Sequence, residues 1–308
     1  CDGALCCSQA PFWWASPMSV TTSSRWSDLG LRLASAAVIV PVAGVCIWLG
    51  GLVYDVLILL AMFGLAWEGE TLVGQNLRTW RGALLLLWPV ISGIAALKGE
   101  WTAALGMAVM AIVFGARFCV PVAVAIVGGL SLLWLRHLPS GAASVMFVIA
   151  VVVASDSMAY VAGRIFGGPK LAPSISPGKT RSGALGGLVG ASVAGGLVAF
   201  FSGYGAVGSA FVWGAVLGVC SQSGDLLESA VKRRLGVKDS GRLIPGHGGL
   251  LDRFDGLLAA APVAALISLA VLGQPFWSAT PRALVAGAVA PAFSHGRIPH
   301  GSLLRWHY

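Results

Sequence analysis

Long apolar runs recur along most of this chain, and they restrict its possible folds more than any other feature. A helix of about 20 apolar residues crosses the roughly 30 Å hydrocarbon core of a bilayer. Within lipid, such a helix also satisfies its own backbone hydrogen bonds. Hydrophobic residues make up 57% of the 308 positions and charged residues only 10%, whereas about a quarter of a typical soluble domain is charged. The sequence therefore predicts an all-α polytopic membrane protein.

We expect about nine transmembrane helices from the lengths of these runs. They are predicted near residues 31–50, 52–70, 82–97, 101–116, 118–135, 141–163, 183–203, 205–228 and 256–273. Arg117 and Pro121 provide the only sign of a break between the fourth and fifth helices. In the seventh helix, Gly186, Gly190 and Ala194 recur every four positions. That spacing is typical of close helix packing in lipid.

The predicted helices fall into two sets. Residues 25–140 are expected to form N-terminal membrane helices, and residues 141–273 a second membrane domain that carries both large polar loops. We expect residues 1–24 to be an unstructured N-terminal extension and residues 274–308 to be a C-terminal tail. We assign no function to either end.

Basic residues give the predicted orientation, because cytoplasmic loops of membrane proteins are rich in Lys and Arg. With the N-terminus inside, two polar loops, residues 164–182 and 229–255, face the cytoplasm. This topology explains the net charge of +8, so nucleic acid is not an expected partner. The first loop holds four basic residues and no acidic one. It suits an anionic substrate, or it marks only the cytoplasmic side.

The stretch Cys220–Asp255 is polar within otherwise apolar surroundings. It holds five of the twelve acidic residues and six of the twenty basic residues. Asp225 and Lys232 share one helical face, and Asp252, with Asp255 three residues later, opens the next helix. We expect Asp225, Asp252 and Asp255 to converge as oxygen ligands for a hard cation such as Mg²⁺. The alternative is that these acids pair with neighbouring lysines and arginines.

Asp156 is a further candidate, because it lies inside the sixth predicted helix. An ionisable group at that depth is costly and is by default functional, facing the interior of the bundle. The alternative is a structural acid that pairs with a neighbouring helix.

A glycine-rich segment, Pro245–Gly249, leads into the last predicted helix. Glycines let backbone amides approach a ligand closely, and a helix N-terminus favours anions. His247 is either a hydrogen-bond donor to phosphate or an ordinary loop histidine. Lys232, Arg233 and Lys238 would neutralise a polyphosphate, or they mark only the cytoplasmic side. These residues indicate phosphoryl or nucleotidyl transfer by positioning and charge neutralisation.

Two segments resemble one known family, the phosphatidate cytidylyltransferases (CDP-diacylglycerol synthases). The first is Ser229–Asp255, SAVKRRLGVKDSGRLIPGHGGLLDRFD, which is similar to the signature of that family over about a dozen specified positions. The second is Ser155–Thr180, which includes SDSMAY and ISPGKT and resembles the other polar loop of the family. One departure is Arg181-Ser182, where many members carry Trp-Glu. We therefore assign no catalytic acid at that corner.

The resemblance implies an integral membrane enzyme that converts CTP and phosphatidic acid into CDP-diacylglycerol and pyrophosphate with Mg²⁺. It implies metal-binding roles for Asp225, Asp252 and Asp255. We predict catalytic roles for Asp156, Lys232, Asp239 and His247. We predict substrate contacts for Lys179, Arg233, Lys238, Gly248, Gly249 and Arg253. The resemblance further implies a homodimer in the inner (plasma) membrane, with a site that faces the cytoplasm. Some members of the family also use K⁺ beside the Mg²⁺.

Two other functions fit part of the pattern. A CTP-dependent kinase of a polyprenol or phytol alcohol would transfer the γ-phosphoryl group and release CDP. A membrane transporter would account for an acid within a helix and for the many glycines. However, transporter acids usually lie near the bilayer midplane, whereas these acids cluster at one predicted face. The long Ser229–Asp255 signature argues against the kinase, so the family resemblance favours the cytidylyltransferase.

Overall fold

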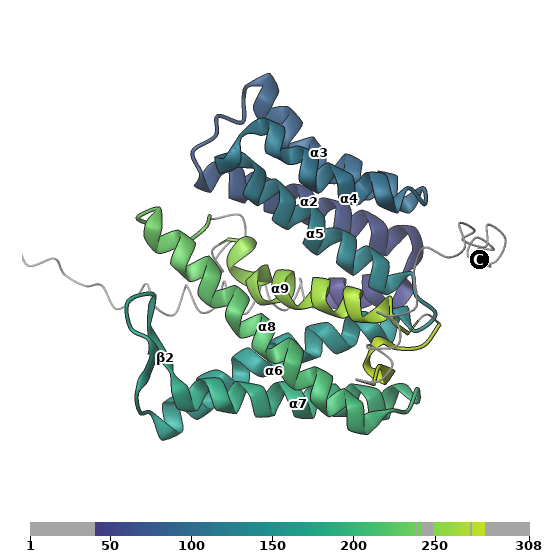
Figure 1. Cartoon of the computed structure of the whole chain (residues 1–308), viewed down its shortest axis with the longest axis vertical. Helices are drawn as coiled ribbons and strands as arrows, with labels where there is room; N and C mark the ends of the chain where they lie inside the picture. Colours follow the sequence, from purple (N-terminus) through teal and green to yellow (C-terminus); the bar gives the residue numbers. More distant parts are fainter. Residues whose placement is uncertain (1–40, 238, 242–248, 272, 281–308) are drawn as a thin grey trace, which may run out of the picture.

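The computed structural model describes residues 41–237, 239–241, 249–271 and 273–280, and it is almost entirely helical (Figure 1). Six of the described helices are long and apolar enough to cross a membrane. They are α2 (Gly51–Leu72), α3 (Trp80–Leu97), α5 (Ala116–Arg136), α6 (Gly141–Phe166), α7 (Arg181–Ser202) and α8 (Val207–Arg234). The all-α membrane class is therefore confirmed, while the number of nine spans stays a prediction.

Helices α2, α3, α4 (Trp101–Met110) and α5 form one group, and α6, α7 and α8 form another (Figure 1). Helix α9 (Leu251–Ser268) packs against α8 in one group and against α5 in the other. It carries Asp252, Arg253 and Asp255 at its start and is not among the six apolar spans. The polar beginning of α9 is thereby placed between the two groups of helices.

The fourth predicted helix, 101–116, is two shorter elements. Helix α4 (Trp101–Met110) continues as the 3₁₀ helix η1 (Ala111–Phe114), and α5 begins directly afterwards. The break falls at Gly115, whose φ of 101° is a conformation that residues with a side chain rarely adopt. Pro121 lies inside α5. The predicted break between the fourth and fifth helices is therefore confirmed, but it lies at Gly115, and Pro121 is not part of it.

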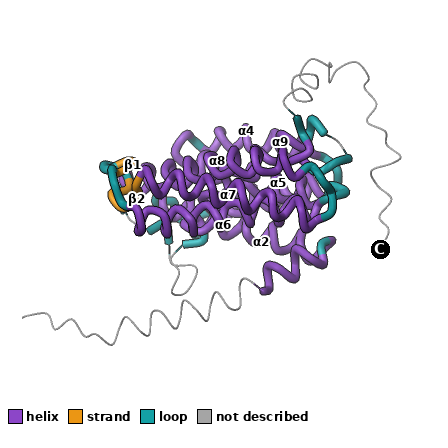
Figure 2. Tube along the Cα trace, turned by 90° about the horizontal axis from the view of Figure 1, so that it is seen from below, coloured by secondary structure: helices purple, strands orange, loops and turns teal. Residues whose placement is uncertain are grey.

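The first predicted polar loop, 164–182, contains a short hairpin. Strand β1 (Lys170–Ala172) pairs antiparallel with β2 (Ser176–Thr180), and both lie at one end of the helices (Figure 2). Thr180 ends β2 and caps α7, because its Oγ1 accepts a hydrogen bond from the Gly183 backbone N–H at 3.1 Å. The hairpin therefore holds a defined position beside the helix ends.

The small residues of α7 allow α6 to pack closely against it. A Cβ atom added at Gly190 would lie 2.5 Å from Cγ of Met158, and one at Gly186 would collide with Ala162. Both contact residues belong to α6. The packing role predicted for Gly186 and Gly190 is therefore confirmed.

Candidate active site

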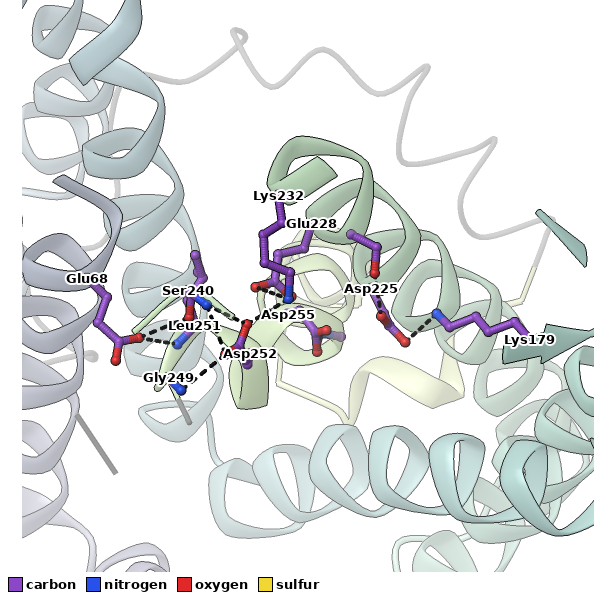
Figure 3. A network of polar contacts seen from close by, with 12 residues as sticks. Glu68, Lys179, Asp225, Glu228, Lys232, Ser240, Gly249, Leu251, Asp252 and Asp255 are labelled. Atoms are coloured by element: carbon purple, nitrogen blue, oxygen red, sulfur yellow. Dashed lines mark hydrogen bonds and ion pairs between the residues drawn. The ribbon is translucent and has the colours of Figure 1, made fainter. Parts of the chain in front are cut away.

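Charged side chains from four elements meet at one end of the helices (Figure 3). The last turns of α8 and the first turns of α9 supply most of the acids. Strand β2 contributes Lys179, and Glu68 comes from α2. The polar stretch therefore does not form this cluster alone.

Asp252 is the most extensively hydrogen-bonded acid of the cluster (Figure 3). Its Oδ1 accepts a hydrogen bond from Nζ of Lys232 at 2.7 Å. The Ser240 backbone N–H lies 3.1 Å from each carboxylate oxygen, and that of Gly249 lies 3.1 Å from Oδ2. Burial by itself raises the pKa of Asp252, but these hydrogen bonds outweigh it and hold the pKa below its ordinary value. Asp252 is therefore an anion fixed in one orientation.

Asp255, one turn further along α9, is in a different environment. Its Oδ1 accepts a hydrogen bond from the Gly256 backbone N–H at 2.6 Å. Burial, a hydrogen bond with Glu228 and the negative charges of Asp225 and Glu228 raise the pKa of Asp255 to about 8. Two carboxyl groups form a hydrogen bond only when one of them is protonated. Without a bound cation, the Asp255–Glu228 pair therefore holds a proton near neutral pH.

Glu228 of α8 adds an acid that was not among the predicted site residues. Its Oε1 lies 3.3 Å from Nζ of Lys232, and its side chain is only 10% exposed. Within the described part of the chain, this carboxylate lies between the ammonium group of Lys232 and the carboxyl group of Asp255. Glu228 therefore adds a buried negative charge to the cluster, beside the predicted metal-binding acids.

Asp225 joins the hairpin to α8. Its Oδ2 forms an ion pair with Nζ of Lys179 on β2, and Oγ of Ser229 lies 3.5 Å from its Oδ1. Arg233 makes a second link, since its Nε donates to the backbone oxygen of Ile175 at 3.4 Å. The hairpin therefore forms one wall of the cluster.

Asp156 does not face the interior of the bundle as expected. Its side chain is exposed, although it lies close enough to Asp255 and Asp225 for their charges to interact. The preceding residue, Ser155, takes the interior position: it is fully buried, and its Oγ accepts from Nε2 of Gln222 at 3.2 Å. Successive residues on a helix point about 100° apart. Asp156 therefore lies at the solvent-accessible edge of the cluster, while Ser155 lies in the core.

The three predicted metal-binding acids are each held by something other than a metal in this structure. Asp225 contacts Lys179, Asp252 contacts Lys232, and Asp255 contacts Glu228. Among the described residues, no group of three or more His, Cys, Asp or Glu side chains is arranged to hold a metal ion. The role of these acids in metal binding therefore stays a prediction.

Comparison with known proteins shows the family. A sequence model described as the Cytidylyltransferase family matches residues 30–271, which is most of the chain. The chain belongs to this family. A phosphatidate cytidylyltransferase of Brucella abortus is 39% identical over 275 residues, covering 81% of this chain and 96% of the relative. The phosphatidate cytidylyltransferase of Haemophilus influenzae is 48% identical over 122 residues, 38% of this chain and 42% of that protein. The uncharacterized protein YnbB of Escherichia coli is 40% identical over 135 residues, 42% of this chain and 45% of that protein.

The remaining predicted site residues differ in position. Lys238, His247 and Gly248 lie outside the described residues. Asp239 and Arg253 are exposed, whereas Gly249 is buried and contributes its backbone N–H to Asp252. In this member of the cytidylyltransferase family, Gly249, the described residue of the glycine-rich segment, therefore forms its hydrogen bond with an acid of the protein itself.

Sequence reasoning missed Glu68 of α2. Its side chain is 3% exposed, and its Oε2 accepts a hydrogen bond from the Leu251 backbone N–H at 2.8 Å. The signal was present in the sequence, because Glu68 and Glu70 are acids within an apolar run, and such acids are rare without a function. Their distance from the polar stretch along the chain hid the connection.

Proposed function

We propose that this protein is a membrane-bound phosphatidate cytidylyltransferase, which converts CTP and phosphatidic acid into CDP-diacylglycerol and pyrophosphate. The observation that carries the proposal is the cluster of lysines and carboxylates at the ends of α8 and α9, next to apolar helices. The phosphate of a lipid lies at the membrane surface. A water-soluble nucleotide meets it only where polar groups border apolar helices. The Brucella abortus relative, named for this activity and aligned over 81% of the chain, supports it.

The reaction is a displacement at phosphorus. An oxygen of the phosphatidate phosphate attacks the α-phosphorus of CTP, the bond to the β-phosphate oxygen breaks, and pyrophosphate leaves with that electron pair. Phosphatidate is already an anionic nucleophile, so the chief obstacle is the repulsion between two polyanions. Preorganised positive groups lower such a barrier. We assign this role to Lys179, Lys232 and Arg233. The first lies on β2, and the other two lie on α8.

The carboxylates fit the Mg²⁺ that the family resemblance implies. Mg²⁺ prefers oxygen ligands and commonly uses one or two carboxylates together with substrate phosphates. Asp225, Asp252 and Asp255 would hold it, and the carboxylate of Glu228 adds oxygen donors beside them. When bound, Mg²⁺ would neutralise charge on the nucleotide phosphates. A second cation such as K⁺ rests on the family resemblance alone.

The proposed location is the inner (plasma) membrane, with the site on the cytoplasmic side, where CTP is available. The basic residues around the site support this orientation through the positive-inside rule. Lys179, Lys232, Arg233 and Arg234 all lie at this end of the helices. A homodimer is expected from the family resemblance only.

The proposal is tested with the purified full-length protein in detergent or lipid nanodiscs, given CTP and phosphatidate with and without Mg²⁺. We expect pyrophosphate release that EDTA abolishes and Mg²⁺ restores. Release of CDP would indicate the lipid kinase instead. Asp252→Asn should lower turnover by more than about 100-fold. This is more than the usual effect of replacing a residue that contacts a metal ligand and not the metal itself. Its control is Glu100→Gln, an exposed acid at the start of α4. Near-normal activity of Asp252→Asn would refute the metal assignment.

A further inference from the structure

Helix α9 begins without a cap from its own sequence. The residue at its N-cap is Leu250, whose side chain makes no capping hydrogen bond. The first backbone N–H groups of a helix have no partner within the helix and need an acceptor elsewhere. Oε2 of Glu68 supplies one, because it accepts from the Leu251 backbone N–H at 2.8 Å. The acceptor therefore comes from α2, at a separation of 183 residues.

The same carboxylate also contacts Ser240, Gly241 and Gly249, the last residue of the glycine-rich segment (Figure 3). Oγ of Ser240 donates to Oε2 of Glu68 at 3.4 Å. A Cβ atom at Gly241 would lie 2.7 Å from Oε1 of Glu68, and one at Gly249 would lie 2.8 Å from Oε2. Both glycines are therefore packed directly on this buried side chain. One carboxylate holds residues 240–241 close to residues 249–251.

These contacts lead directly to Asp252. The backbone N–H groups that orient its carboxylate come from Ser240 and Gly249. Both donors belong to the segments that Glu68 contacts, and Leu251 is the residue immediately before Asp252. A displacement of Glu68 would therefore move the donors and the backbone of Asp252 together.

We propose that Glu68 is a positioning residue of the site: it fixes the backbone donors and the helix start that orient the Asp252 carboxylate. The inference rests on the proposed function for the role of Asp252, but the anchoring itself does not. Glu68 does not need to touch either substrate. It acts through Asp252, and it connects the N-terminal group of helices to the site.

The test compares Glu68→Ala, Glu68→Gln and the control Glu70→Gln in the full-length protein. Gln keeps an oxygen that accepts from the Leu251 N–H, while Ala removes the acceptor. Glu70 is a matched control, since it is a fully buried acid on the same helix whose oxygens have no hydrogen-bond partner among the described residues. Amide hydrogen exchange over residues 249–256, measured without substrate, reports the anchoring. The Mg²⁺ concentration at half-maximal activity and the KM for phosphatidate report its consequence.

We expect Glu68→Ala to speed exchange over residues 249–256 and to raise the half-saturating Mg²⁺ concentration about 10- to 100-fold, the usual cost of losing an outer-shell partner. The KM for phosphatidate should change little, and Glu68→Gln should recover much of both losses. Unchanged exchange in Glu68→Ala overturns the anchoring. Faster exchange with an unchanged Mg²⁺ requirement overturns the positioning role and leaves only a helix cap. If the wild type releases no pyrophosphate, the proposed function fails, and the exchange comparison alone decides the anchoring.

Discussion

Replacement of Lys232 by methionine tests how the acidic cluster is held together without a bound cation. Nζ of Lys232 lies 2.7 Å from Oδ1 of Asp252 and 3.3 Å from Oε1 of Glu228. The side chains of these three residues are only 12%, 14% and 10% exposed. Methionine keeps most of the apolar length of the lysine and removes its charge. Lys232→Met therefore leaves two nearly buried carboxylates without their shared counter-ion.

The size of the effect follows from what Asp252 retains. Removing one partner of a buried ion pair costs about 3–5 kcal/mol, because an uncompensated charge stays buried. Asp252 keeps its hydrogen bonds from the Ser240 and Gly249 backbone N–H groups, and a hydrogen bond to a charged group contributes about 1.5–3 kcal/mol. We therefore expect Lys232→Met to lower the free energy of unfolding by about 3 kcal/mol, the lower end of that range.

The assay is reversible unfolding in mixed micelles, at neutral pH and with EDTA present. Lys98→Met is the control, because Lys98 is an exposed lysine, and surface substitutions usually change stability by no more than about 0.5 kcal/mol. The double variant Lys232→Met/Asp252→Asn should recover part of the loss, since it also removes one of the stranded charges. If Lys232→Met costs less than about 1 kcal/mol, or if the double variant is no more stable than the single one, the argument that Lys232 holds a buried pair is refuted.

Three further predictions concern pH, packing and topology. The pKa of Asp255 is raised from 3.8 to about 8, so the folded protein binds the extra proton, and the associated stability is full below about pH 4 and lost as the pH rises through about 8. In EDTA, the thermal midpoint should fall between pH 6 and about 8.5, and Asp255→Asn should flatten that fall; equal slopes would contradict the assignment. Gly224→Ala should destabilise the protein by about 1–3 kcal/mol, because the added Cβ would lie 2.5 Å from Cβ of Ala259. The control is Gly106→Ala, where nothing lies within 4 Å of the added Cβ. Equal stabilities of the two variants would refute the packing argument. In a cysteine-free background, Arg234→Cys should be labelled only from the cytoplasmic side, and periplasmic labelling would reverse the proposed topology.

The local pattern of apolar and acidic residues was sufficient to predict several of the helices and the acids that open α9. The apolar runs predicted α2, α3, α6 and α7 to within a few residues, and Asp252 and Asp255 open α9 as expected. The prediction erred where backbone geometry decided the outcome. Gly115 breaks the chain with its positive φ, which is one of several conformations open to glycine. A single sequence does not state which conformation is used.

The orientation of Asp156 shows a second limit. Its position in an apolar helix predicted a side chain inside the bundle, but Ser155 occupies that side and is hydrogen-bonded there by Gln222 of α8. Choosing between two adjacent residues requires the rotation of α6 against α8. That rotation depends on contacts between segments that are far apart in the sequence. Glu68 was missed for the same reason, since its importance comes from Leu251 and Ser240.

The roles of the acids in the cluster depend on its net charge, so they could not be predicted from each residue separately. In the part of the cluster formed by β2, α8 and α9, four carboxyl groups, those of Asp225, Glu228, Asp252 and Asp255, meet the ammonium groups of two lysines, Lys179 and Lys232. If every group were ionised, the six would carry a net charge of −2, from four negative and two positive charges. Such an excess is unfavourable in a poorly hydrated site, so a proton on Asp255 relieves part of it. A divalent cation would neutralise the same excess and displace that proton. The cluster therefore favours cation binding through its total charge, to which a strand and two helices contribute.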